Sequence, residues 1–117
     1  MPSLESVAND INQLLPEGET CLAGFFAKTT YPHDQFWLPR IVMVTTNGVR
    51  VFTGGVIKSW EPGTLIASLP FGEPIEYKQK LVTHRVNIED QRLRVGLTQK
   101  KFLEHAAKVS RRERPVV

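Results

Sequence analysis

Residues 40–53 read RIVMVTTNGVRVFT, and they decide the fold class because two apolar, β-branched segments meet across an Asn-Gly pair. Val, Ile, Thr and Phe are enriched in strands, and Asn and Gly both accept the positive φ angles that a tight hairpin turn requires. The pattern predicts a β-hairpin with Asn47 and Gly48 as its two loop residues in a type I′ turn.

The same hairpin indicates how the sheet must be buried. With a two-residue turn at this position, Val44 faces Val51 and Met43 faces Phe52. Side chains alternate between the two faces of a strand, so apolar residues occupy both faces of this hairpin. Both faces must then be covered, which favours a two-layer sheet or a partly closed barrel, with helices or a partner chain over whatever the sheet leaves open.

An amphipathic helix is expected on each side of the strands. The first covers about residues 3–15, and the last covers about residues 98–110 with Thr98 as its cap. Between them, residues 19–97 read as about six or seven short antiparallel strands, with Gly24 as a bulge or a point of close approach. This order predicts an α+β fold.

The composition is that of one ordinary globular domain. The chain has 117 residues, of which 41% are hydrophobic and 23% charged. We expect a single domain over residues 1–110 and a basic, flexible tail over residues 111–117. Residues 111–114 supply +2 of the net charge of +3, so the rest of the chain is nearly neutral. A nearly neutral body argues against a broad phosphate-binding face.

Targeting and cofactor signals are absent from the sequence. Residues 1–6 lack the basic start and apolar core of a signal peptide, and no apolar run approaches the roughly 20 residues of a membrane span. Cys21 is the only cysteine, which excludes an intramolecular disulfide and a Cys-based zinc site. No Gly-rich phosphate loop or nucleophile elbow is present. We therefore expect a cytoplasmic protein that is not an enzyme and holds no cofactor or metal.

Three isolated titratable residues are expected to have structural rather than functional roles. His84 falls within the apolar stripe of its strand, so we expect a buried, hydrogen-bonded imidazole rather than a ligand. His105 lies on a flank of the last helix and is expected to be exposed. Cys21 sits in an apolar strand with no basic neighbour in the local sequence, so its thiol is expected to be inert.

A second hairpin, around residues 89–90, offers a candidate anion-binding face. A two-residue turn there places Arg85 opposite Arg94 and Asn87 opposite Arg92. Like charges that face each other are unfavourable unless an anion or an acidic partner neutralises them. The alternative is a solvated face that nearby carboxylates partly neutralise.

A loop with three aromatic residues is the candidate for partner contact. Tyr31, Phe36 and Trp37 lie among prolines, in a segment more typical of an adhesive surface than of a plain connector. Such a loop could hold a peptide, another subunit or a membrane interface. The alternative is that Phe36 and Trp37 close the mouth of the barrel. Trp60 is the fourth candidate for partner contact.

The chain resembles the small bacterial pleckstrin-homology-like (PH-like) domains, in which a β meander is closed by a C-terminal helix and an extra helix precedes it. Three segments carry the resemblance. Residues 14–19 (LLPEGE) resemble the "LL-x-GE" entry to the first strand, residues 42–52 resemble the family's hairpin, and residues 59–70 (SWEPGTLIASLP) resemble some actinobacterial members.

The resemblance implies a PH-like antiparallel β sandwich or partly open barrel. It also implies a binding or assembly module without chemistry of its own, and several bacterial members form ring-like oligomers. In lipid-binding PH domains, a lysine at the end of strand one and two basic residues in strand two clamp phosphates. Lys28 and Arg40 match two of those positions, but Val42 occupies the third, so inositol phosphate recognition is not expected.

Two functions follow as hypotheses. The first is a non-enzymatic module that acts through protein–protein contacts or self-assembly. The second is an anion-binding domain that engages anionic lipid headgroups or nucleic acid through Arg85, Arg92 and Arg94, extended by Lys78 and Lys80 and helped by the basic tail. Binding to phosphates weakens steeply with salt, whereas an apolar assembly interface is nearly indifferent to it.

Overall fold

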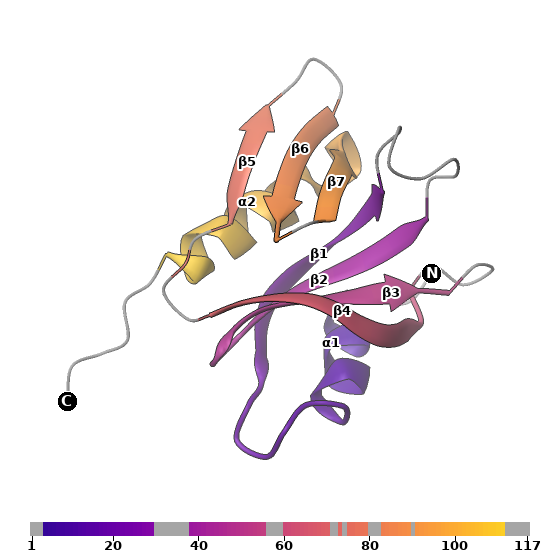
Figure 1. Ribbon diagram of the computed structural model, residues 1–117, viewed down its shortest axis with the longest axis vertical. Helices are drawn as coiled ribbons and strands as arrows, with labels where there is room; N and C mark the ends of the chain where they lie inside the picture. Colours follow the sequence, from indigo (N-terminus) through magenta and orange to yellow (C-terminus); the bar gives the residue numbers. More distant parts are fainter. Residues whose placement is uncertain are drawn as a thin grey trace.

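The computed structural model describes residues 4–29, 38–55, 60–70, 73, 75–79, 83–89 and 91–111. Over these residues the protein is an α+β fold with two α-helices and one seven-stranded antiparallel sheet, as predicted (Figure 1). The helices are α1 (Leu4–Asn12) and α2 (Lys100–Ser110), with a short 3₁₀ helix, η1 (Leu97–Gln99), before α2. The strands are β1 (Cys21–Thr29), β2 (Pro39–Thr45), β3 (Gly48–Gly54), β4 (Pro62–Pro70), β5 (Glu76–Gln79), β6 (Thr83–Ile88) and β7 (Gln91–Gly96).

The strands form a meander in which the first strand also pairs with the last. Their order across the sheet is β4-β3-β2-β1-β7-β6-β5, so β4 and β5 are the edge strands. The ladder between β1 and β7 is only two pairs long, and one of these pairs is Lys28 with Arg94. Beside the ladder, the side-chain carbonyl of Gln99 accepts the backbone N–H of Phe26 at 3.1 Å. A side chain thus satisfies a donor that the short ladder leaves unpaired.

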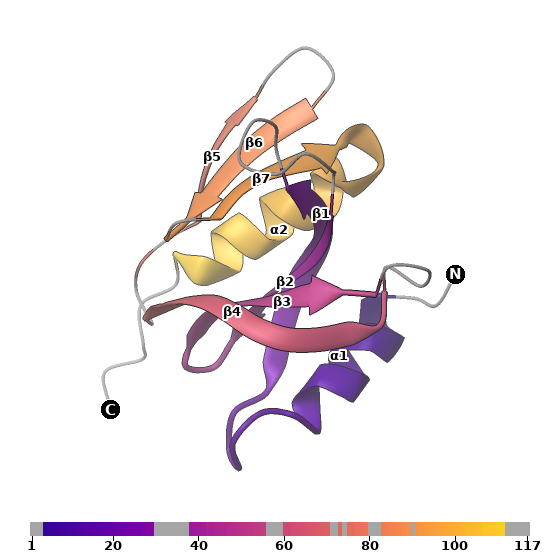
Figure 2. The ribbon, with the colours of Figure 1, turned by 45° about the vertical axis from the view of Figure 1, so that its right-hand side comes forward.

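Helix α2 packs on one face of the sheet, which we call the inner face. Figure 2 shows α2 enclosed between β5–β7 and the strands β2–β4. Leu103, Ala106 and Val109 of α2 belong to the main apolar core. The buried members from the strands and the turn before β5 are Phe25, Ala27, Val42, Val44, Val49, Val51, Ala67, Ile75, Val86, Ile88, Leu93 and Val95.

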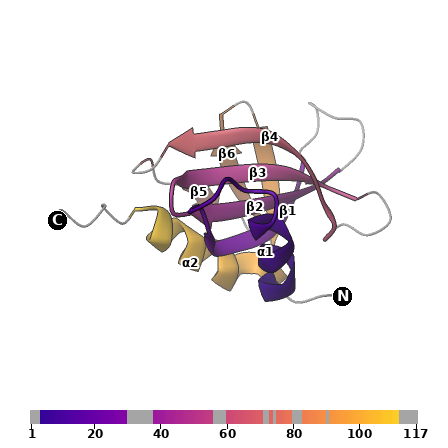
Figure 3. The ribbon, with the colours of Figure 1, turned by 90° about the horizontal axis from the view of Figure 1, so that it is seen from below.

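Helix α1 covers the β1–β3 half of the opposite face, which we call the outer face; Figure 3 shows α1 crossing β1. The side-chain carbonyl of Asn12 accepts the backbone N–H of Cys21 at 2.8 Å, which holds the end of α1 to the start of β1. A Cβ on Gly24 would collide with the side chain of Met43, so the predicted close approach at Gly24 is confirmed. The buried cluster under α1 consists of Val7, Ile11, Ile41, Met43 and Phe52.

The first hairpin forms, but its turn differs from the prediction. Thr45 pairs with Gly48, so the two loop residues are Thr46 and Asn47 rather than Asn47 and Gly48. Among the described residues other than glycine, only Glu89 has a positive φ. The prediction of a type I′ turn was therefore wrong.

Local contacts stabilise the observed register. The hydroxyl oxygen of Thr45 accepts the backbone N–H of Asn47 at 3.2 Å and lies 3.1 Å from the carbonyl oxygen of Gly48. Gly48 has φ 143° and lies so close to β4 that a Cβ would collide with the carbonyl oxygen of Leu69. The shift moves each partner by two residues, which keeps every side chain on its face, so both faces are apolar as predicted. The observed pairs are Val44 with Val49 and Ile41 with Phe52, in place of Val44 with Val51 and Met43 with Phe52.

The second hairpin has the predicted register. Arg85 pairs with Arg94 and Asn87 with Arg92 across β6 and β7. Glu89 follows β6 with φ 51°, the left-handed conformation that such a turn requires and that a residue with a Cβ seldom adopts. The turn chemistry and the apolar alternation of the two strands therefore agree here.

Glu89 also connects the two halves of the sheet. Its carboxylate accepts the backbone N–H of Ser68, in the edge strand β4, at 2.8 Å. Strands β4 and β6 lie far apart in the strand order, so this bond requires a strongly curved sheet. The sheet nevertheless stays open, because β4 and β5 do not pair in the part of the chain that the structure describes.

Both helices are shorter than predicted. α1 ends at Asn12 rather than near residue 15, and a turn follows before the chain enters β1. α2 begins at Lys100, and its N-cap is Gln99, so the prediction of Thr98 as the cap was wrong. Thr98 lies inside η1, because the chain first makes a tighter 3₁₀ turn. Neither described helix is long and apolar enough to cross a bilayer.

Candidate anion-binding face

Four basic residues stand side by side on the outer face of the sheet. Lys78 on β5 pairs with Arg85 on β6, Arg85 pairs with Arg94 on β7, and Arg94 pairs with Lys28 on β1. We call these four residues the basic row. Lys28, Lys78 and Arg85 are exposed and Arg94 is half-buried. The structure thus brings Lys28, Arg85 and Arg94 together with Lys78, which was predicted to extend this face.

A second row crosses the same strands two residues further along. It consists of Glu76, Asn87 and Arg92, all exposed. Arg92 and Arg94 also take part in interactions of their own within the chain. The carboxylate of Glu89, in the turn between β6 and β7, bonds to the backbone of β4.

Neither described helix covers this part of the outer face. Phe26 belongs to the cluster under α1, and Lys28, two residues along on the same face of β1, is exposed. The border between the covered and the bare half therefore runs across β1. None of the large apolar side chains that are exposed in the described residues lies on β5–β7; they are Leu14, Leu22, Leu65, Leu97 and Phe102, and Leu22 lies near the start of β1, away from Lys28.

Charge is distributed unevenly along the chain, and in the folded molecule this places acidic residues at one end. Residues 1–27 contain four acidic residues and no lysine or arginine, so residues 28–117 carry a net charge of +7. Figure 1 shows α1 at one end of the molecule and β5–β7 at the other. The nearly neutral composition therefore conceals an acidic end at α1.

The structure separates Arg40 from the basic row. Arg40 pairs with Ala27 and shares the alternation of Val42, whose side chain lies in the inner core, whereas Lys28 is on the outer face. One guanidinium N–H group of Arg40 donates to the carbonyl oxygen of Pro39 at 2.9 Å, and its buried Nε has no partner. Lys28 and Arg40 thus do not form a joint site of the kind that lipid-binding PH domains use.

The structure gives less support to the residues predicted for partner contact than to those predicted for anion binding. Tyr31, Phe36 and Trp37 lie outside the described residues, as does Lys80 of the predicted basic patch. Trp60 is half-buried and packs against the cluster under α1. Much of its ring therefore packs in the core and does not form a contact surface for a partner.

A buried carboxylate that the sequence reasoning missed ties β1 to the first hairpin. Glu19 accepts a hydrogen bond from the hydroxyl of Thr45 at 2.7 Å, from the side-chain amide of Asn47 at 3.3 Å, and from Nε of Arg50 at 3.1 Å. Burial alone raises the pKa of Glu19, but the bonds from Thr45, Arg50 and Asn47 and the charge of Arg50 outweigh it and hold this pKa below its ordinary value. The network is structural, because every acceptor oxygen is already bonded.

The other titratable groups offer no second site among the described residues. Burial and the nearby Glu19 carboxylate raise the pKa of Cys21 to about 11, as expected for an inert thiol. His84 is buried as predicted, but neither ring nitrogen has a hydrogen-bond partner, so the expectation of a bonded imidazole was wrong. Its ring packs edge-on against Tyr77. His105 is exposed, as predicted, and the described residues contain no group of three His, Cys, Asp or Glu arranged to hold a metal.

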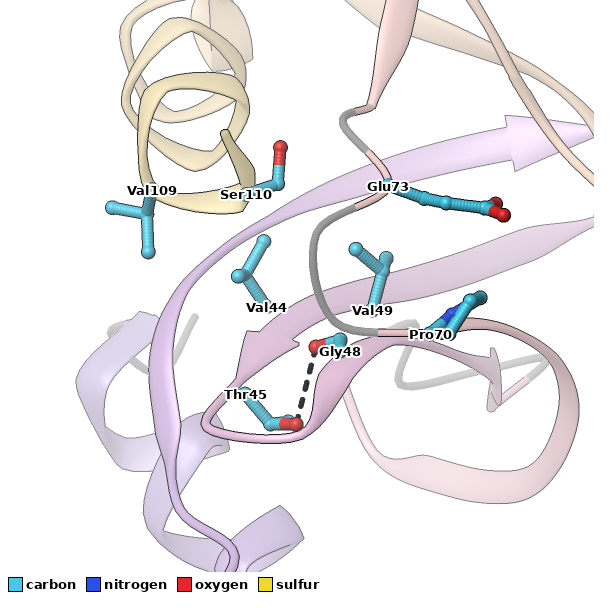
Figure 4. Close-up of a pocket in the computed structure, with 8 residues that line it drawn as sticks. All are labelled: Val44, Thr45, Gly48, Val49, Pro70, Glu73, Val109 and Ser110. Carbon is cyan, nitrogen blue, oxygen red and sulfur yellow. Dashed lines mark hydrogen bonds between the residues drawn. The ribbon is translucent and has the colours of Figure 1, made fainter. Parts of the chain in front are cut away.

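A small cleft lies between the first hairpin and the end of α2 (Figure 4). It offers about 10 Å³ to the centre of a water molecule, roughly what one water requires. On its α2 side, Ser110 donates its hydroxyl to the carbonyl oxygen of Ala107 at 2.8 Å and accepts the backbone N–H of Ile75 at 3.0 Å. The cleft is too small for an organic ligand.

No family model, no curated protein and no solved structure matches this chain.

Proposed function

We propose that the protein is a non-enzymatic binding domain that holds a polyanion on the outer face of β5–β7 and β1. The observation that carries the proposal is the register of the basic row, Lys28-Arg94-Arg85-Lys78, across four neighbouring strands. Neighbouring strands lie about 4.8 Å apart, so each cation has a like charge beside it. Like charges directly opposite each other weaken a sheet, and an anion laid along the row reverses that effect.

The chemistry of the basic row suits phosphate or carboxylate groups. Arg85 and Arg94 present planar guanidinium groups that can bond two oxygens at once, while Lys28 and Lys78 add point charges at the two ends. Lys28, Lys78 and Arg85 make no ion pair with any described residue. Three of the four charges are therefore available to a ligand.

We further propose that the fold is PH-like. The strand order supports this assignment, since a seven-stranded meander opens between β4 and β5 and joins β1 to β7. The C-terminal helix α2 packs into the inner face, and α1 precedes the first strand, as in the bacterial domains that the sequence resembles. Here the binding face would be the sheet itself rather than the position shared by Lys28 and Arg40.

Isothermal titration calorimetry with inorganic polyphosphate tests the proposed function. We expect the wild-type chain to bind polyphosphate and the double variant Lys78→Glu with Arg85→Glu to lose about tenfold or more in affinity. Both side chains are exposed, so the variant should fold normally by circular dichroism.

The matched control is Lys101→Glu with Lys108→Glu on α2, which changes the net charge by the same amount on the helix that covers the inner face. This control should retain most of the affinity. A wild-type chain that does not bind polyphosphate, or equal losses in the two double variants, would refute the proposal.

Self-assembly is the second candidate function, and the edge strand β4 supports it. β4 is nine residues long and has no charged side chain, and such edges tend to pair with other strands. Several features weigh against pairing here: prolines at both ends of β4, two irregularities in its ladder with β3, and the bond from Ser68 to Glu89. Light scattering across a range of protein concentrations, at low and at high salt, tests whether the chain self-assembles. An oligomer that survives high salt would support self-assembly, and a monomer throughout would exclude it.

A further inference from the structure

We infer that the polyanion is the phosphate backbone of a double-stranded nucleic acid, lying along the basic row and contacted without base readout. This inference rests on the proposed function, because it names the class of ligand for the same face. It goes beyond that function in predicting the number of phosphates, the direction in which the ligand lies and the indifference to sequence.

The length of the row sets the number of phosphates that it can contact. From Lys28 to Lys78 the row crosses three strand spacings, about 14 Å in total. One strand of a DNA duplex carries a phosphate for roughly every 3.4 Å of helix axis, so about four phosphates of one strand fall within that length, and about three of them face the row because the strand winds around the axis. The three cations of the row that make no ion pair with a described residue, Lys28, Lys78 and Arg85, thus meet about three phosphates without bending the duplex.

An acidic peptide matches the row less well. Spacing does not separate the two ligands, because acidic side chains on one face of an extended peptide recur about every 6.6 Å and bring two or three carboxylates to the row. Protein interfaces, however, are usually anchored by aromatic residues. The described part of the outer face of β5–β7 exposes no large apolar side chain.

The neighbouring row argues for a linear ligand rather than a planar one. A bilayer surface would lie over both rows and would place anionic headgroups against Glu76, an exposed carboxylate that pairs with Asn87 beside the basic row. A duplex laid along the basic row contacts its four cations first. Single strands are usually held by aromatic stacking, for which the described residues of this face offer no exposed ring.

The polarity of the molecule is consistent with this docking. The first 27 residues hold four acidic and no basic residues, and α1 lies at the end of the molecule away from β5–β7. A duplex would repel the acidic α1 end, which orients the protein before contact. The row would then run along the duplex.

Fluorescence anisotropy with a labelled DNA duplex about two helical turns long tests the inference. We expect affinity to fall with salt between about 50 and 200 mM, with a slope of log K against log salt near −2.7, corresponding to about three phosphate contacts. Lys78→Gln should reduce the magnitude of this slope by about one. Lys101→Gln, on α2, should leave it unchanged. Two duplexes of unrelated sequence should bind equally.

Competition separates the possible ligands. The same labelled duplex is challenged with the corresponding single strand, with poly-glutamate and with vesicles that contain phosphatidylserine. Preference for the duplex supports the inference. Preference for poly-glutamate or vesicles, lost in Lys78→Glu with Arg85→Glu, would overturn the inference and leave the proposed function standing. Failure to bind the duplex, polyphosphate and every competitor would overturn both.

Discussion

The two halves of the outer sheet face differ in what covers them. Over β1–β3, helix α1 seals a cluster that includes Ile11, Ile41 and Met43, which are fully buried. Over β5–β7 the same face is open and carries Arg85 and Lys78 in register. The inner face shows no such difference, because α2 and the sheet share one core. The contrast is therefore confined to one side of one sheet.

The difference shows where the chain uses its sheet for stability and where it leaves a surface for a ligand. Apolar burial under α1 contributes roughly 25 cal/mol for each Å² removed from water. The basic row contributes nothing of that kind, and its like charges weaken the sheet slightly. Substitutions should therefore affect folding strongly in the first half and weakly in the second.

Ile11→Ala should destabilise the half of the sheet that α1 covers, and its effect on stability should be the largest. Ile11 is 0% exposed, so the substitution leaves a cavity under α1, and we expect a loss of about 3 kcal/mol in the free energy of unfolding. Urea unfolding followed by circular dichroism measures it. Leu14→Ala is the control, since Leu14 is 57% exposed and should change stability by less than about 0.5 kcal/mol. Equal effects would mean that α1 does not seal the sheet.

Glu19→Gln should weaken the attachment of β1 to the first hairpin. At neutral pH we expect a loss of about 2 kcal/mol, because Arg50 loses its buried anionic partner. The folded state lowers the pKa of Glu19, so its contribution to stability is full above the pKa of the unfolded chain and is lost as pH falls through the lower folded value.

Unfolding of wild type and Glu19→Gln from pH 7 down to pH 3 checks this sign. The difference between them should shrink below the ordinary Glu value of 4.5. Glu17→Gln, two residues away and exposed, should behave as wild type throughout. A gap between wild type and Glu19→Gln that grows as the pH falls would contradict the role assigned to the carboxylate.

His84→Leu should stabilise the β5–β7 half. The imidazole is 1% exposed with both nitrogens unbonded, so an apolar side chain of similar volume removes a desolvation cost, and we expect a gain of about 1 kcal/mol. Thermal unfolding measures the gain. His105→Leu, at an exposed position of α2, should give almost none. A loss of stability in His84→Leu would show that the ring makes a bond that the structure lacks.

Arg85→Gln, in the half of the outer face that no described helix covers, should give the smallest change in stability. Removing one charge from the middle of the basic row relieves repulsion on both sides, so we expect a gain of about 0.3 kcal/mol at low salt. The gain should vanish at about 1 M salt, where the screening length is about 3 Å. Urea unfolding at the two salt concentrations decides, and a salt-independent gain would rule out repulsion as its cause.

The two hairpins show how much of the strand pairing the local sequence pattern can predict. In the second, the alternation of β6 and β7 around Glu89 predicted the pairing of Arg85 with Arg94 correctly. In the first, two registers bury the same apolar faces, so the pattern could not choose between them. The choice depends on Gly48 lying against β4 and on Thr45 reaching Glu19, contacts that residues distant in the sequence supply.

The sequence by itself determined the α+β class, the two apolar faces of the first hairpin and the arginine pair of the second, because side-chain alternation and turn chemistry act over a few neighbouring residues. Only the tertiary structure placed Lys28 beside Arg94, set α1 over one half of the outer face and buried Glu19. Those outcomes depend on β1 pairing with β7 across most of the chain. Net charge could not reveal the basic row, since charge is summed along the sequence and a binding face is assembled in space.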